Sequence, residues 1–249
     1  MFFFRLNKLK IVDNHEKRQV LQLFGSDKAE VQLSSFITTD STHLPELGEL
    51  LATDNARRKQ ELTAQTVARV VDSRVLTTIQ NVTDNHEMTF GDTGYVLYQS
   101  EQIPEQFDWI LLAIESDQDV RDLGEEMNSV LRNTEFQSTL DQTLALAATA
   151  ANPSYTAAVS IGKLVTKMLA QQYRKNDDDM IGVLYTSLNR REHYPHGERK
   201  KDKVPDLTNN MFVDYSIFGF DPQPQPVPMH RLPPVTATRG IQPRRRIGA

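Results

Sequence analysis

The 249-residue chain has no cysteine. This absence excludes disulfide bonds, thiolate catalysis and cysteine-ligated zinc or iron–sulfur sites, and it fits a reducing compartment. No apolar run approaches the roughly 18 residues of a membrane span. The N-terminus also lacks the order of charges and the small-residue cleavage site of a signal peptide. We therefore expect a cytoplasmic protein whose membrane contact, if any, is peripheral.

The familiar catalytic motifs are also missing from the sequence. It contains no G-x-x-x-x-G-K-[ST], G-x-G-x-x-G, G-x-S-x-G or H-E-x-x-H. One fragment remains, because Asp92-Thr93-Gly94 matches the D-T-G loop of aspartic proteases. Two such loops must face each other to share a proton, so a protease would have to be a dimer. Gly91 and Tyr95 around the fragment favour a hairpin turn instead, and these observations favour a protein that is not an enzyme.

Two histidines form a second candidate for chemistry. His193 and His196, with Glu192 and Glu198 beside them, offer nitrogen and oxygen ligands for a metal. Many basic residues surround them and would repel a divalent ion, which favours a solvated loop. The same basic residues can bind a phosphate or the acidic surface of a protein partner. The predicted partner-binding residues are Arg190, Arg191, Arg199, Lys200, Lys201, Arg244, Arg245 and Arg246, with Lys203 nearby.

Charge and proline are unevenly distributed along the chain. The net charge is −5, yet residues 222–249 contain five arginines, no acid and seven of the twelve prolines. Such a segment favours extended polyproline II and cannot build a core of its own. We expect residues 221–249 to form an extended Pro/Arg-rich arm that binds outside its own domain. The acidic remainder argues against a nucleic-acid partner.

Alternating apolar residues predict mainly β structure. In the first strand the apolar phase changes between Leu6 and Leu9, which predicts a β-bulge near Asn7 and Lys8. The predicted strands are 2–11, 29–38, 72–82, 95–99, 107–115, 180–188 and 211–218. Residues 83–94 have turn chemistry, and residues 189–210 form a long charged excursion.

Helical periodicity is concentrated in the middle of the chain. Phe136, Leu140 and Leu144 are spaced by four, and a second stripe follows Asn152-Pro153. They predict a two-helix insertion at about 116–176. Residues 44–66 contain good helix formers, but the interruption at Asp54-Asn55 predicts short helical turns and a loop there.

Acidic residues follow three of the predicted strands. Calcium prefers six to eight oxygen ligands, and one loop after the strand 107–115 supplies several carboxylates. Two more carboxylates would join them if the loops gather at one end of a sandwich. The candidate metal ligands are Asp117, Asp119, Asp122, Asp13 and Asp40. The alternative interpretation is that these acids start a helix, because carboxylates are favoured at the positive end of its dipole.

The strand order, the FDW strand followed by S-D-Q-D, and the opening FRLNKLKIVDN together resemble C2 domains, the calcium- and phospholipid-binding β-sandwiches. The resemblance covers residues 1–120 and 178–220 and implies a C2-like antiparallel sandwich of about eight strands. The domain predicted over residues 1–220 also contains the helical insertion, which an ordinary C2 domain lacks. The resemblance also implies calcium-binding aspartates in a D-x-D pattern, which Asp117-Gln118-Asp119 matches.

The predicted function is a non-enzymatic interaction or assembly module. It would dock to protein partners, or to further copies of itself, through loops, the helical insertion and the C-terminal arm. The alternative is calcium-dependent binding to anionic membrane. A hydrolase of unknown type is the second alternative. No cofactor is expected for the interaction module, and calcium is the candidate cofactor of the membrane-binding alternative.

Overall fold

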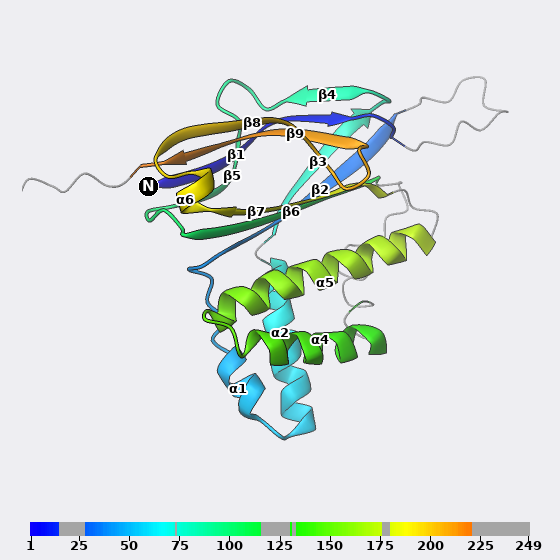
Figure 1. The fold of residues 1–249 in the computed structure, drawn as a ribbon. Coiled ribbons are helices and arrows are strands. Elements are labelled where there is room, and N and C mark those ends of the chain that lie inside the picture. The colour runs from blue at the N-terminus through cyan, green and yellow to red at the C-terminus, as the bar shows by residue number, and fades with distance from the viewer. Residues whose placement is uncertain (15–27, 73, 116–129, 131–132, 176–179, 221–249) are drawn as a thin grey trace, which may run out of the picture.

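Two antiparallel sheets and a layer of helices make up the structure, a computed structural model that describes residues 1–14, 28–72, 74–115, 130, 133–175 and 180–220 (Figure 1). The outer sheet has the order β4-β1-β9-β8, with β5 also paired to β1, and the inner sheet has the order β3-β2-β6-β7. The strands are β1 (Phe2–Ile11), β2 (Ala29–Thr39), β3 (Val75–Val82), β4 (His86–Thr89), β5 (Tyr95–Ser100), β6 (Gln106–Glu115), β7 (Met180–Asn189), β8 (Gly197–Pro205) and β9 (Met211–Gly219). The predicted mainly β, antiparallel architecture is confirmed.

The helices lie on one side of the inner sheet, so that this sheet is the middle of three layers (Figure 1). They are α1 (Leu47–Ala52), α2 (Ala56–Asp72), α4 (Thr134–Ala147) and α5 (Pro153–Lys175), while the short α6 (Arg190–His193) follows β7. The predicted helices of the insertion are α4 and α5, whose apolar stripes are buried. No helix in the described ranges is long and apolar enough to cross a membrane.

The predicted β-bulge in β1 is confirmed. Phe2, Phe4 and Leu6 are buried, and burial then moves to Leu9 and Ile11. The pairing of β1 with β9 shifts register between Leu6 and Lys8. One extra residue restores the inward direction of the later side chains, because successive strand residues point to opposite faces.

Strand β6 is buried on both faces and joins two hydrophobic cores. Its odd-numbered residues from Phe107 to Ala113 lie between the two sheets, where Phe4 and Tyr215 pack against Trp109. Leu112 and Ile114 point the other way, into the core of the helical layer. The sequence of a strand that is covered on both faces is a continuous apolar run, and residues 109–114 of β6, WILLAI, form such a run.

The expectation of short turns and a loop over residues 44–66 was wrong in its second half. Asn55 does not interrupt a helix but begins α2, because its side-chain Oδ1 accepts a hydrogen bond from the backbone N–H of Arg58 at 3.1 Å. Asn is among the preferred residues at a helix N-terminus. The buried face of α2 includes Leu62, Val67 and Val70.

Two segments without predicted strands contain short regular elements. Within 83–94, β4 pairs with the end of β1, and turn chemistry flanks it at Asn85, Gly91 and Gly94, all with positive φ. The charged excursion 189–210 contains α6 and β8. Almost every residue of β8 is exposed, so it carries no apolar alternation from which a strand could be predicted.

Candidate functional site

A cleft of about 540 Å³ lies between α5 and the outer edge of the inner sheet at β7. Most of its surface is apolar. The residues that line it come from β6, α5, β7 and the loop after β8, and they are Ile110, Lys163, Thr166, Lys167, Ala170, Gln171, Met180, Val183, Tyr185, Leu207 and Thr208. We call this site the α5–β7 cleft. Its volume lies within the range of small-molecule binding sites, about 300–1,000 Å³.

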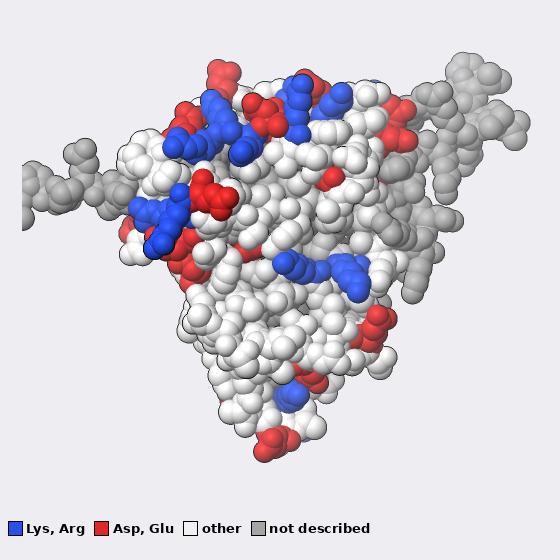
Figure 2. All heavy atoms as spheres, viewed as in Figure 1, with Lys and Arg blue, Asp and Glu red and all other residues white. Residues whose placement is uncertain are grey.

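The polar residues of α5 reach the cleft because they share one face of the helix. Lys163, Thr166 and Lys167 are separated by three and four residues, which places them within one turn of each other. Both lysines are exposed, and no described carboxylate lies within ion-pair distance of either. Figure 2 shows blue side chains at the level of α5 with a largely white surface around them. Among the described residues, the cleft therefore carries positive charge without an ion-pair partner beside apolar walls.

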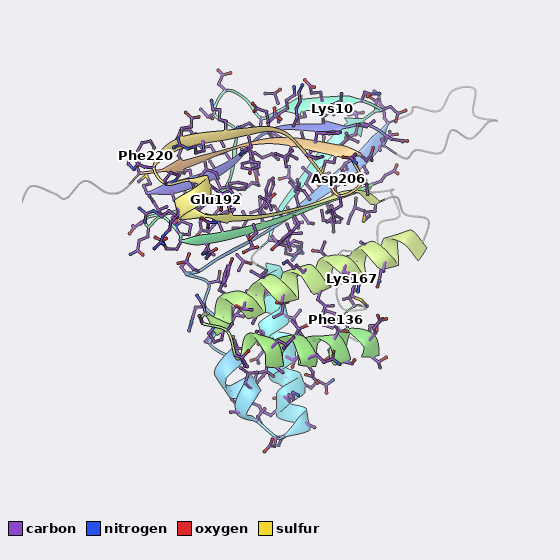
Figure 3. All side chains as sticks on the ribbon, viewed as in Figure 1. Lys10, Phe136, Lys167, Glu192, Asp206 and Phe220 are labelled. Atoms are coloured by element: carbon purple, nitrogen blue, oxygen red, sulfur yellow. The ribbon has the colours of Figure 1, made fainter. Side chains whose placement is uncertain are left out.

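Lys163 is held against the wall formed by β7. Its Nζ atom lies 4.1 Å from the centroid of the Tyr185 ring, close enough for a cation–π interaction. This contact places the ammonium group beside the β7 wall of the cleft. Figure 3 labels Lys167 on α5 and, across from it, Asp206 in the loop that follows β8.

Thr166 provides an unsatisfied polar group inside the cleft. Its side chain is 4% exposed, and its Oγ1 has no hydrogen-bond partner. Thr66 on α2 shows the usual solution for a buried helical threonine, because its Oγ1 donates to the carbonyl of Leu62 at 2.8 Å. A buried hydroxyl without a partner costs free energy. Thr166 lines the cleft, and its buried hydroxyl has no hydrogen-bond partner among the described residues.

A buried carboxylate holds Tyr185, which lines the cleft, in place by a hydrogen bond. Asp108 on β6 is 4% exposed and accepts hydrogen bonds from the hydroxyl groups of Tyr185, at 2.5 Å, and of Tyr155 at the start of α5. Burial raises the pKa of both phenols above the ordinary value of 10, and the bonds to Asp108 raise it further. Both tyrosines stay neutral donors in the physiological range, so the group ties α5 to the inner sheet.

The loop after β8 forms the opposite wall. The buried carboxylate of Asp206 accepts from the backbone N–H groups of Val183, Asn210 and Met211 and from the hydroxyl of Thr208. The N–H of Leu207 donates to the carbonyl of Val183 at 2.9 Å. These bonds fasten the loop to the edge of β7. They hold Leu207, which is 77% exposed, at the mouth of the cleft.

The proposed metal ligands do not form one site within the described residues. Asp117, Asp119 and Asp122 lie outside those residues. Asp13 follows the end of β1, whereas Asp40 lies at the other end of the sandwich, beside the start of β1 (Figure 1). The Asp40 carboxylate accepts from the N–H groups of residues 105 and 106. In the parts of the chain that the structure describes, no three acidic or histidine residues are placed to hold a metal.

The D-T-G fragment lies in the turn that joins β4 to β5. The turn is confirmed, but the hairpin is wrong, because β4 and β5 both pair antiparallel with β1 and therefore run in the same direction along it. Gly94 has φ +75°, and a Cβ atom there would lie 2.4 Å from Oδ1 of Asn7. The carbonyl of Thr93 accepts a hydrogen bond from the Arg5 guanidinium at 3.3 Å. Both the positive φ and the close approach require glycine at this position.

The two histidines have separate environments. His193 lies in α6, and its Nδ1 accepts a hydrogen bond from the N–H of Asn189 at 3.1 Å. The His196 ring packs edge-on against Phe220, with the ring centroids 5.5 Å apart. The structure therefore gives each histidine a local packing or hydrogen-bonding role.

The predicted partner-binding residues that the structure describes divide into two groups. Arg190 pairs with Glu105 at 3.2 Å and fastens α6 to the loop before β6. Arg191, Arg199, Lys200 and Lys201 are exposed on α6 and β8. Arg244, Arg245 and Arg246, with the rest of the arm, lie outside the described residues.

None of the polar residues in the α5–β7 cleft stands out in the sequence. Lys163 and Lys167 look like the solvated face of an amphipathic helix, and Thr166 looks like a neutral helix residue. One signal was present, because Asp108 interrupts the apolar strand FDWILLAI with a charge. A charge within a buried strand requires partners, and it indicates a polar cluster on that face.

No model of a known protein family matches this chain, and no curated protein matches it in sequence.

Proposed function

We propose that this protein is a non-enzymatic interaction module that docks an acidic protein partner through the edge of its outer sheet. We call this surface the basic edge and define it by Arg191, Arg199, Lys200, Lys201 and Lys203. The observation that carries the proposal is the exposure of β8, in which every residue from 198 to 203 is accessible. Figure 2 shows blue side chains along this edge, with some red among them.

The charge of the basic edge is opposite to that of the whole chain. Residues 190–203 contain six basic and three acidic residues, while the chain has a net charge of −5. Lys200 pairs with Glu198 at 3.1 Å. No described carboxylate lies within ion-pair distance of Arg191, Lys201 or Lys203. Lys203 acts electrostatically on Glu87, whose pKa it helps to lower. Among the described residues, Arg191 and Lys201 are left to pair with a partner, and such contacts increase the association rate and select acidic surfaces.

Docking through side chains suits β8 better than addition of another strand. The pairing of β8 with β9 shifts register between Lys201 and Val204, and Lys203 has φ +54°. A bulge and several lysines on an edge strand are the usual means of preventing edge-to-edge pairing. The side chain of Asp214 replaces a ladder contact by accepting from the Lys203 N–H at 2.6 Å.

We also propose a C2-like strand topology, calcium ligation by Asp117 and Asp119, and capture of a neighbouring molecule by the arm 221–249. Calcium binding has a direct test, because a ligand that binds only the folded protein raises its melting temperature. An unchanged melt between EDTA and millimolar calcium would remove the calcium-dependent membrane alternative.

The basic edge can be tested with a defined acidic probe. A fluorescein-labelled twelve-residue peptide of alternating Glu and Ala is titrated with the full chain at low salt, and anisotropy is measured. We expect Arg199→Glu with Lys201→Glu to weaken binding at least tenfold. We expect 0.5 M NaCl to weaken wild-type binding similarly, because exposed charge pairs are screened.

The matched control is Lys163→Glu with Lys167→Glu, which changes the net charge by the same amount at the α5–β7 cleft. This control should bind the acidic peptide within about threefold of the wild type. Equal losses in both double variants would mean that the peptide responds to net charge alone, and would overturn the basic edge as a docking surface.

A further inference from the structure

We propose that the α5–β7 cleft binds a small amphipathic carboxylate, with its apolar chain between α5 and β7 and its carboxylate at Lys163, Thr166 and Lys167. This site is separate from the basic edge and does not depend on it. Three observations support it: the volume, the two uncompensated lysines and the buried hydroxyl without a partner.

The positive charges select an anion for the polar end. Lys163 and Lys167 are one turn apart on α5, and Thr166 lies between them on the same face. A carboxylate here would accept charge-assisted hydrogen bonds from the ammonium groups and one from the Thr166 hydroxyl. The ligand would thereby satisfy the buried hydroxyl that the protein leaves unpaired. The same charges disfavour the basic segment 222–249 as the occupant.

The walls beyond the lysines select an apolar body. Met180, Val183, Ile110 and Ala170 line the cleft there, and Leu207 projects at its mouth. A saturated chain of about ten carbons occupies less than the 540 Å³ of the cleft. Each methylene buried adds about 0.8 kcal/mol, equivalent to about fourfold in affinity. Affinity should therefore rise with chain length until the cleft is filled.

The walls are rigid enough to form a prearranged site. Tyr185 is fixed by Asp108, and the loop with Leu207 is fixed by Asp206 and by the backbone of Val183. Lys163 is already held over the Tyr185 ring. A preformed site binds more tightly because less freedom is lost on binding.

The test is isothermal titration calorimetry of the full chain with octanoate, decanoate and dodecanoate, each below its micelle concentration. We expect binding that tightens by about fourfold per methylene. Decanol, which has the same chain without the charge, should bind at least tenfold more weakly than decanoate. Equal binding of decanol, or no binding of any carboxylate at millimolar concentration, would overturn the proposal.

Three variants assign the binding to the named residues. Lys163→Met with Lys167→Met should weaken decanoate binding at least tenfold, while the charge variants of the basic edge should leave it within twofold. Thr166→Val should weaken decanoate about three- to tenfold yet raise the melting temperature of the free protein, because it removes a buried unpaired hydroxyl. Thr66→Val is the matched control and should not change affinity. A Thr166→Val protein that binds normally would contradict the assigned role.

A membrane surface also combines anionic groups with apolar chains. A second measurement distinguishes membrane binding from binding of a single small ligand. Vesicles of phosphatidylcholine with phosphatidylserine are sedimented with the protein. We expect no depletion of the protein by these vesicles at physiological salt. Lysine-dependent sedimentation together with no binding of monomeric decanoate would show that the cleft is part of a membrane-docking surface, and would overturn the small-ligand assignment.

Discussion

The two faces of β6 bury different kinds of side chain. On the sandwich face, Trp109 packs among aromatic rings, and its indole N–H donates to Ser35 at 2.7 Å. On the helical face, the Asp108 carboxylate holds two tyrosines, and a cleft remains beside Ile110. Aromatic rings fill the sandwich core, whereas the described helices leave a cleft between α5 and the β7 edge of the inner sheet. The difference places the candidate binding site on the helical side.

The largest expected effect tests whether these two faces unfold together. Phe136 on α4 is fully buried in the helical layer (Figure 3), so Phe136→Ala should lower the free energy of unfolding by about 3–5 kcal/mol. Trp109 is the single tryptophan, so its fluorescence reports the sandwich core, and the far-ultraviolet circular dichroism signal reports the helices. Because both cores share β6, the two signals should follow one urea transition. A helical signal that is lost first would show that the layers are separable.

A second prediction concerns the polar group of the helical face. Asp108→Ala removes the acceptor of both tyrosine hydroxyls and should lower the free energy of unfolding by about 2–3 kcal/mol. Asp108→Asn keeps the shape and one acceptor oxygen, so it should cost less. Urea denaturation measures both variants. An alanine variant as stable as the wild type would mean that desolvation of the carboxylate cancels the contribution of its hydrogen bonds.

The corresponding change on the sandwich face should be smaller. Ser35→Ala leaves the Trp109 indole N–H without its neutral acceptor, with an expected loss of about 1–2 kcal/mol. The same urea titration, followed by circular dichroism, provides the comparison. A loss larger than that of Asp108→Ala would reverse the proposed difference between the two faces.

The last effect is absent at neutral pH and appears only at high pH. Burial raises the pKa of Tyr215 in the sandwich core to about 12, compared with an ordinary value of 10. Because the folded state keeps its proton longer, this stability is fully present below pH 10 and is lost between pH 10 and 12. Tyr215→Phe should therefore decrease the slope of unfolding free energy against pH in this window, by up to about 1.4 kcal/mol per pH unit. Equal slopes for wild type and variant would contradict the burial effect.

Many of the strands and helices could be predicted from the sequence because they depend on the local periodicity of apolar residues. The phase change in β1 located its bulge, and the four-residue spacing from Phe136 to Leu144 located α4. The sequence-based prediction failed where a residue type can either interrupt a helix or begin one. Asn55 predicts an interruption, whereas in the structure it begins α2. Strand β8 was missed because an exposed edge strand has no buried face to impose alternation.

The candidate sites also combine features that the sequence predicts with contacts that it does not predict. The exposure of Lys200 and Lys201 could be predicted from their charge, but the pairing of Arg190 with Glu105 could not, since the two residues are 85 positions apart. The α5–β7 cleft could not be predicted either. It brings Ile110, Thr166, Val183 and Leu207 together from four separate elements.

By itself, the sequence determined the class of structure: strand and helix periods, the turn at Gly94, the excess of basic residues between 190 and 203, and the absence of cysteine chemistry. For the described residues, the tertiary structure alone decided which charges lack an ion pair and which buried hydroxyls, that of Thr166 among them, lack a hydrogen-bond partner. Side-chain periodicity is a local property set by backbone geometry, whereas pairing and cavities depend on which distant surfaces meet. Lys167 is for that reason an ordinary helical lysine in the sequence and part of a candidate anion site in the folded protein.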